Sequence, residues 1–287
     1  MALKKISLKQ IRDFSRTSPI YFSTAFTLLV TLLNLTFAHL NFLLLPHSTW
    51  GRILHEVVCI IWPTVLVVIF GYSFCFRRRG IRATFGASWL VFLFYGVLVL
   101  SAVRLKIGNP AASWKSELEI FYGILMLIGI GIREEILFRG VIANAIARKY
   151  GSTTKGLWIT VFSAGAIFGA WHLSNVFTGS SFKGALIQAI ACVGAGVLFC
   201  AIYLRGGSIW VVALLHSLRD TAGLVDVLFI NTAESLSVSE SISSYDLKVI
   251  PVIAAEVLLA AYLMRKSKQQ KIFDRIQQLN SSELAEF

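Results

Sequence analysis

The sequence is poor in charged residues. Only 15% of its 287 residues are Asp, Glu, Lys or Arg, and 56% are hydrophobic. Soluble globular domains carry about 25% charged residues, so the composition excludes an ordinary soluble domain. Cysteine is also scarce, and the four cysteines lack the spacing of a zinc site or a disulfide framework: Cys59, Cys75, Cys192 and Cys200. We interpret them as small buried hydrophobic residues.

Three further features are missing from the sequence. The chain has no H-E-x-x-H motif of the kind found in zinc proteases. It has no internal repeat, whereas many membrane transporters are built from repeats. We also expect no cleavable signal peptide, because the basic N-terminal region precedes an apolar run of about 25 residues, longer than the core of such a signal. The missing repeat counts against a transporter.

Long apolar stretches make up most of the chain. A helix needs about 20 mainly apolar residues to cross a bilayer, and eight stretches reach that length: 20–45, 53–76, 84–103, 119–147, 156–176, 184–204, 208–230 and 248–264. Only helices and closed barrels satisfy the backbone polar groups in lipid. We therefore predict an all-α integral membrane protein, a polytopic bundle of about eight transmembrane helices. It divides into a basic N-terminal flank (1–19), a membrane domain (20–265) with a motif-bearing core (116–230), and a C-terminal tail (266–287).

The excess of basic residues has a topological explanation. The chain has 27 lysines and arginines against 15 acidic residues, a net charge of +12. With the N-terminus inside, the outer loops hold few of the basic residues: Arg52, Arg104, Lys106, Lys115, Lys183 and Lys248. This asymmetry is the positive-inside pattern, and the inner charges would meet anionic lipid head groups. We predict a bacterial plasma (inner) membrane protein with both termini cytoplasmic, in contact with the lipid bilayer and not with nucleic acid.

The stretch GIREEILFRGV at 131–141 places four charges inside an apolar run. A charge near the centre of a membrane helix costs about 2.5–3.5 kcal/mol on insertion scales and usually marks a functional site. Glu135 and Arg139 are four residues apart, so they share a helix face and can pair. Glu134 lies about 100° round the helix and has no such partner, which leaves its carboxylate available as a general acid or base. The sequence suggests no role for Arg133.

Two other spans contribute ionisable residues: His172 in FGAWH, and His216, Arg219 and Asp220 in HSLRD. His216 and Asp220 again lie four residues apart on one helix face. A carboxylate, two imidazoles and a fourth polar group from three helices can converge in the bundle interior and activate water there. Arg219 either lines a water path, binds a substrate carboxylate, or packs with its head group snorkelled toward water.

The remaining ionisable residues near the spans receive simpler interpretations. We interpret His55 and Glu56, at the entrance of a span, as solvated residues. We interpret Asp226 as a polar residue at the outer end of its span.

Three motifs in the second half of the chain carry a family resemblance. EEILFR at 134–139 matches E-E-x-x-x-R, FGAWH at 168–172 matches F-x-x-x-H, and HSLRD at 216–220 matches H-x-x-x-N/D. In this order and in separate spans, they resemble the signatures of the CAAX prenyl endopeptidase type 2 and bacteriocin-processing (CPBP) family of intramembrane proteases. The resemblance covers 116–230.

The resemblance implies an intramembrane endopeptidase. Its predicted catalytic residues would be Glu134, which activates water with the help of His172, and His216 and Asp220, which stabilise the oxyanion. Glu135 and Arg139 would support the site. The substrate would be a membrane-anchored protein or peptide. Prenylated CAAX proteins, bacterial leader peptides and membrane-anchored C-terminal tails all stay open.

The sequence leaves alternatives open for the cofactor and for the class of function. Glu134, His172 and His216 could form a three-ligand zinc site, but every ligand would come from a different helix. We favour a glutamate-type mechanism without a cofactor and keep metal dependence as the alternative. Two other functions are a non-proteolytic immunity or scaffold protein and a proton-coupled transporter. The complete motif set favours the protease, because a scaffold has no need of Glu134.

Overall fold

The computed structural model describes residues 7–45, 48–77, 80–109, 112–231 and 236–284. These residues are almost entirely helical, which confirms the predicted all-α membrane bundle. The outer parts of the predicted flank and tail, residues 1–6 and 285–287, lie outside the described residues.

The helices and strands follow one another along the chain as follows: α1 (Leu8–Thr17), α2 (Pro19–Leu44), α3 (Thr49–Ile69), η1 (Ser73–Phe76), α4 (Ile81–Ile107), β1 (Ser113–Trp114), α5 (Glu117–Glu135), η2 (Ile136–Ala143), α6 (Asn144–Tyr150), α7 (Thr154–Trp171), η3 (His172–Thr178), α8 (Phe182–Gly206), α9 (Ile209–Leu228), β2 (Ile230–Asn231), α10 (Val238–Ser243), η4 (Leu247–Val249), α11 (Ile250–Leu263) and α12 (Lys266–Leu284). Each of the eight predicted stretches coincides with a helix or with consecutive helices.

Length and composition identify fewer membrane spans than the eight predicted. Within the described ranges, five helices are long and apolar enough to cross a membrane, or six if the bent pair Leu247–Leu263 and Lys266–Gln278 forms one span. The helices α5 and α9 are not among them, and both carry charges of the predicted site. The fold therefore confirms a polytopic bundle and leaves the count of eight as a prediction.

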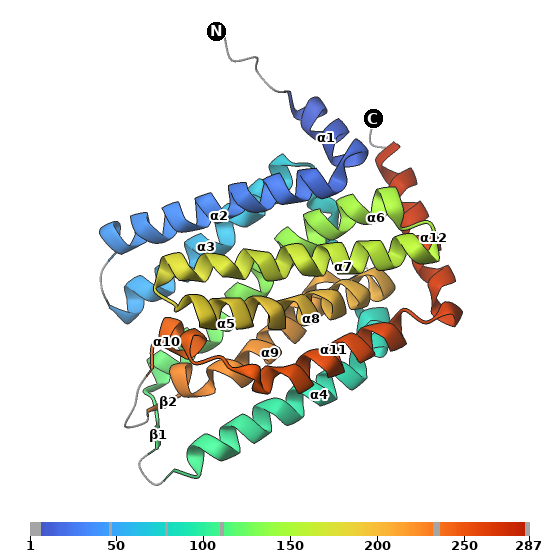
Figure 1. The fold of residues 1–287 in the computed structure, drawn as a ribbon. Helices are drawn as coiled ribbons and strands as arrows, with labels where there is room; N and C mark the ends of the chain where they lie inside the picture. The colour runs from blue at the N-terminus through green and yellow to red at the C-terminus, as the bar shows by residue number, and fades with distance from the viewer. Residues whose placement is uncertain (1–6, 46–47, 78–79, 110–111, 232–235, 285–287) are drawn as a thin grey trace.

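Helix α8 forms the centre of the bundle (Figure 1), where it packs against α4, α7 and α11. Its membrane segment is 72% buried, against 11% for α4 at the periphery. Two glycines of α7 allow the close approach of α8: a Cβ atom at Gly165 would lie 2.7 Å from the Val197 side chain, and one at Gly169 would lie 2.5 Å from the Ala189 carbonyl oxygen. This contact fixes the end of α7, where His172 lies.

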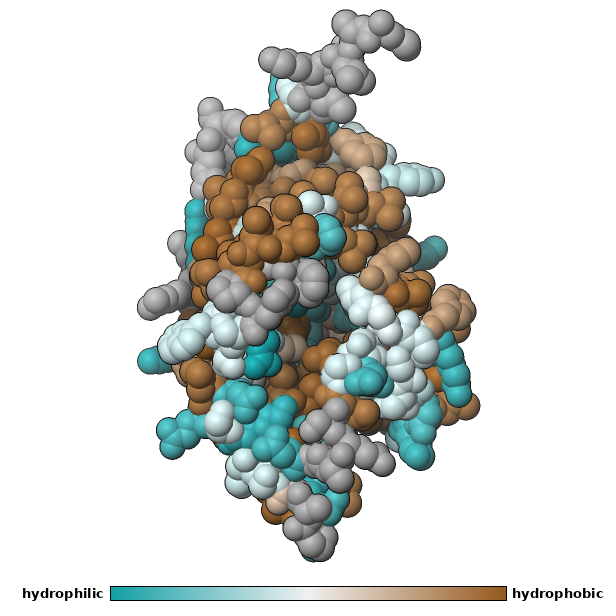
Figure 2. Space-filling view, turned by 90° about the vertical axis from the view of Figure 1, so that its left-hand side faces the viewer, coloured by the Kyte–Doolittle hydropathy of each residue, from teal (hydrophilic) through white to brown (hydrophobic). Residues whose placement is uncertain are grey.

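The two ends of the bundle differ. The helices α1 and α12 lie at one end, and α10 and the antiparallel pair β1–β2 lie at the other (Figure 1). Figure 2 looks onto the second end, where polar residues gather on the lower half, at the level of α10 and the strands. The C-terminal tail is packed rather than loose, because Ile272 and Ile276 of α12 are buried and Arg275 donates to the Tyr203 carbonyl oxygen at 2.8 Å.

Candidate active site

Glu134 and Glu135 lie at the junction between α5 and the π-helix η2. A π-helical turn is rare and occurs frequently at functional sites. Asn144, fully buried at the end of η2, has its Nδ2 atom 3.0 Å from the Arg139 carbonyl oxygen, 2.9 Å from that of Gly140 and 2.9 Å from the Tyr203 hydroxyl. Asn144 thus satisfies carbonyl groups where the helix changes from π back to α. Sequence reasoning missed this residue, although a lone Asn in an apolar run was its signal.

The predicted pair between Glu135 and Arg139 is present. Arg139 Nη1 donates to Glu135 Oε1 at 2.8 Å, and its Nη2 donates to the Gly196 carbonyl oxygen of α8 at 3.3 Å. The guanidinium also lies over the Phe168 ring, 4.5 Å from its centroid. Both side chains are almost completely buried, with exposed fractions of 0% and 1%. The pair therefore ties η2 to α7 and α8 in the centre of the bundle.

His172 ends α7 and begins η3. Its Nδ1 atom lies 2.9 Å from the carbonyl oxygen of Phe168 in the last turn of α7. A carbonyl oxygen can only accept, so Nδ1 carries the proton and the neutral ring presents an acceptor at Nε2. This bond also satisfies a carbonyl that the end of the helix would leave free. The end of the helix thus orients His172 toward the interior.

His216 lies in the middle of α9 and faces three carboxylates. Its Nδ1 atom is 2.7 Å from Glu135 Oε1, and its Nε2 atom is 3.4 Å from Asp220 Oδ2 and 3.6 Å from Glu134 Oε2. Ionised carboxylates only accept hydrogen bonds, so both ring nitrogens can donate. The contact with Asp220 agrees with the predicted spacing along the helix. The stronger contact with Glu135 was not predicted, because it joins different helices.

Glu134 completes the constellation. Its side chain is buried, and Oε2 has no hydrogen-bond partner within the described part of the chain. This oxygen lies between the Nε2 atoms of His216 at 3.6 Å and His172 at 3.9 Å. Both separations exceed a direct hydrogen bond and are the sort that a bridging water spans. The structure therefore brings all four predicted catalytic residues together, and their chemical roles stay predictions.

Aromatic rings enclose the two imidazoles. Phe168 lies 4.8 Å from His172 and 5.7 Å from His216 between ring centroids, and Phe199 lies 5.2 Å from His216. Asp220 is the most exposed of the four residues, with 20% of its side chain accessible against 4–10% for the others. The cluster is therefore most accessible at Asp220.

The zinc alternative depends on how Glu134, His172 and His216 are arranged. Among the residues for which coordinates are described, no group of three His, Cys, Asp or Glu side chains is arranged to hold a metal ion. The Nδ1 atoms of His172 and His216 are engaged by Phe168 and Glu135, and both Nε2 atoms face the same oxygen of Glu134. Metal-ligating histidines commonly donate from their other ring nitrogen to a carbonyl or carboxylate, so these contacts do not exclude zinc, and metal dependence stays the alternative to the cofactor-free prediction.

A comparison with models of known protein families matches part of the chain. The model described as type II CAAX prenyl endopeptidase Rce1-like matches residues 116–222, and all three motifs lie inside this range. Residues 116–222 are similar to this family. Comparisons with curated proteins and with solved structures gave no significant match. The match confirms, for this segment, the resemblance to the CAAX-type membrane proteases that the three motifs predicted.

The Rce1-like segment (residues 116–222) contains two arginines whose partners lie outside it. Arg133 Nη1 lies 3.3 Å from Glu56 Oε2 of α3, and Arg219 Nε lies 2.7 Å from Glu256 Oε1 of α11. Glu56 is only 4% exposed, so the interpretation of it as a solvated residue is wrong. Arg219 packs by ion pairing and does not extend to water. Glu256 was missed altogether, since a single acid in an apolar stretch gives no indication of its partner.

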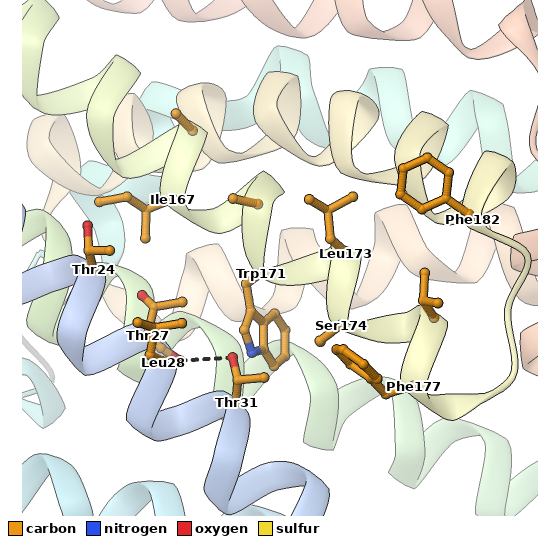
Figure 3. Close-up of a pocket in the computed structure, with 13 residues that line it drawn as sticks. Thr24, Thr27, Leu28, Thr31, Ile167, Trp171, Leu173, Ser174, Phe177 and Phe182 are labelled. Carbon is orange, nitrogen blue, oxygen red and sulfur yellow. Dashed lines mark hydrogen bonds between the residues drawn. The ribbon is translucent and has the colours of Figure 1, made fainter.

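An apolar pocket of about 650 Å³ lies beside the candidate active site, between α2 and the end of α7 (Figure 3). The threonines that line it bond to carbonyl oxygens of their own helix; for example, Thr31 donates to Thr27 at 2.9 Å. Trp171 forms its inner wall and packs edge-on against His172, with ring centroids 5.2 Å apart. None of the four predicted catalytic residues lines this pocket, so Trp171 separates it from the site.

Proposed function

We propose that this protein is an intramembrane endopeptidase in which Glu134 activates the attacking water. The observation that carries the proposal is the position of Glu134 Oε2. It is buried, it lacks a hydrogen-bond partner in the described ranges, and it lies 3.6 and 3.9 Å from the Nε2 atoms of His216 and His172. A general base needs an accessible lone pair beside the water that it deprotonates.

The proposed reaction follows from these positions. A water between Glu134 and His172 donates one hydrogen to each, because the neutral His172 ring offers an acceptor at Nε2. Glu134 takes the proton as the water oxygen attacks the carbonyl carbon of the scissile peptide bond. His216 donates from Nε2 to the resulting oxyanion, with Asp220 beside it. Glu134 then gives the proton to the leaving nitrogen as the C–N bond breaks and the carbonyl re-forms, which releases an amine and a carboxylic acid. The acid, which holds the second hydrogen of the water, passes that proton to the amine and becomes a carboxylate.

The supporting residues act on orientation. Glu135 accepts from His216 Nδ1 and from Arg139, so it holds the imidazole in place while Nε2 stays directed at the site. The aromatic surroundings limit water and strengthen the hydrogen bonds to developing charge. No step of this mechanism requires a metal.

The substrate is a protein or peptide held at the membrane. The family description names prenylated CAAX proteins, so a farnesylated peptide that ends in a CAAX sequence is the first substrate to test. Bacterial leader peptides and membrane-anchored C-terminal tails are the alternatives. The asymmetry of basic residues supports a bacterial plasma membrane location with both termini cytoplasmic, and α1 and α12 lie at the same end of the bundle (Figure 1).

The test compares three proteins in proteoliposomes: the wild type, Glu134→Gln, and Glu119→Gln. Glu119 lies in the first turn of the same helix, and 39% of its side chain is exposed. We expect Glu134→Gln to lose at least 10²-fold in kcat, as is typical for a lost general base, while Glu119→Gln cleaves like the wild type. Wild-type cleavage by a folded Glu134→Gln variant would reject the mechanism.

A further inference from the structure

Arg219 lies between two carboxylates. Its Nε atom is 2.7 Å from Glu256 Oε1, its Nη2 atom donates to the Ala191 carbonyl oxygen at 3.4 Å, and its Nη1 atom is 4.0 Å from Asp220 Oδ1. The guanidinium is therefore bonded to Glu256 and only close to Asp220. Asp220, in turn, directs its other oxygen at His216 Nε2, 3.4 Å away.

Glu256 is held from several sides. Its side chain is completely buried, and Oε1 also accepts from the Tyr95 hydroxyl of α4 at 2.9 Å. Its Oε2 atom occupies the space beside Gly194 of α8, where a Cβ atom would lie 2.9 Å from it. Contacts from α4, α8 and α9 thus hold the Glu256 carboxylate against Arg219, which precedes the site residue Asp220 in the sequence.

We propose that Glu256 is a positioning residue: by binding Arg219 on the α11 side of α9, it prevents Arg219 from pairing with Asp220 and leaves Asp220 to His216. This inference rests on the proposed function, in which His216 and Asp220 stabilise the oxyanion. It assigns a role to an acid outside the Rce1-like segment.

The division of partners follows from charge and distance. An arginine and a carboxylate form a strong charge-assisted hydrogen bond when they meet directly. If Glu256 loses its charge, Asp220 becomes the nearest ionised partner of Arg219, and a shift of about 1 Å closes the remaining 4.0 Å gap to bonding distance. Asp220 would then move toward Arg219 and away from His216. The imidazole would lose one of the groups that hold its Nε2 atom.

The first test uses Glu256→Gln, which keeps the shape and the acceptor for Tyr95 and removes the charge. We expect kcat to fall on the order of tenfold, the scale found when a partner of a functional side chain is removed, with KM unchanged. The matched control is Asp226→Asn, because Asp226 lies on the same helix α9 and pairs with Lys106 of α4, away from the site. It should retain wild-type kcat. Equal kcat values for Glu256→Gln and wild type would overturn the proposal.

A second variant covers the possibility that Glu256→Gln folds poorly. Gly194→Ala places a methyl group 2.9 Å from Glu256 Oε2 and 3.0 Å from the Ile253 side chain, so the carboxylate must shift, while alanine favours the helical backbone. We expect the same fall in kcat with little change in the melting temperature. An unchanged kcat in this variant would also contradict the proposal.

Combination with Asp220→Asn separates positioning from general destabilisation. If Glu256→Gln already diverts Asp220, adding Asp220→Asn should lower kcat less than it does in the wild type. In contrast, Asp220→Asn should lower the melting temperature more in the Glu256→Gln background, because Asp220 is then the counter-charge of Arg219. Additive effects on both quantities would refute the proposal.

The two measurements distinguish this inference from the proposed function. A wild-type protein that cleaves no membrane peptide would reject the proposed function. The melting temperatures of the four proteins would still show whether Arg219 turns to Asp220 when Glu256 loses its charge. A larger loss in the Glu256→Gln background supports the rearrangement, and an equal loss overturns it.

Discussion

Breaking the Glu135–Arg139 pair should destabilise the protein strongly. Both side chains are buried, with exposed fractions of 0% and 1%, so Glu135→Ala leaves a guanidinium without its counter-charge in the bundle centre. Removing one partner of a buried ion pair costs about 3–5 kcal/mol. Each kcal/mol shifts the melting temperature of a protein of 150–250 residues by about 2–4 °C. We therefore expect a loss on the order of 10 °C for Glu135→Ala and for Arg139→Ala.

The structure also predicts a difference between the two single variants. Glu135→Ala removes the acceptor of His216 Nδ1 in addition to the partner of Arg139. Arg139→Ala removes the bond to Gly196 and the cation over Phe168. The activity that remains per folded molecule should therefore be lower in Glu135→Ala. The double variant Glu135→Met/Arg139→Met should recover part of the stability, because well-packed apolar side chains often replace a buried pair without loss.

Thermal unfolding in detergent, followed by circular dichroism, measures these shifts. The control is Asp226→Asn, which breaks a pair whose side chains are 46% and 20% exposed. Pairs this exposed contribute about 0–1 kcal/mol, so its melting temperature should stay near that of the wild type. If Glu135→Ala and Arg139→Ala melt as Asp226→Asn does, the two residues do not form a buried pair and their assignment as site support is wrong.

Three other predictions concern the site and the short helix α10. Asp220→Asn should retain more activity than Asp220→Ala, since an amide still fills the contact with His216 Nε2 and the motif accepts either residue; equal rates in a cleavage assay would remove the polar contact from the mechanism. Asn144→Leu should cost about 1–3 kcal/mol, because it leaves buried carbonyl groups unsatisfied, and a wild-type melting temperature would contradict this. The pKa of Glu240 lies below its ordinary value because the backbone and hydroxyl of Ser237 donate to it. Because the pKa of Glu240 is lower in the folded state than in the unfolded state, ionised Glu240 stabilises the fold at pH values above its unfolded pKa. This stabilisation is lost as the pH falls through the folded pKa. The protection of α10 amides against hydrogen exchange, relative to the intrinsic exchange rate at each pH, should therefore fall in acid in the wild type but not in Glu240→Gln.

Much of the fold follows from local features of the sequence. The eight apolar stretches predicted the helices because a chain in lipid must satisfy its own backbone polar groups. Pairs four residues apart on one helix, Glu135 with Arg139 and His216 with Asp220, were predictable because a helix places such residues on one face. The contacts that join different helices were not, since they depend on how each helix is rotated and how closely it packs.

The sequence by itself determined the membrane class, the order of the motifs and the burial of charge at Glu134. Only the tertiary structure decided which charges meet. It paired Arg133 with Glu56 and Arg219 with Glu256, although these partners are far apart in the sequence. Ion pairs between helices form wherever packing brings opposite charges within a few ångströms in a medium that screens them weakly. Periodicity along one helix carries no information about that proximity.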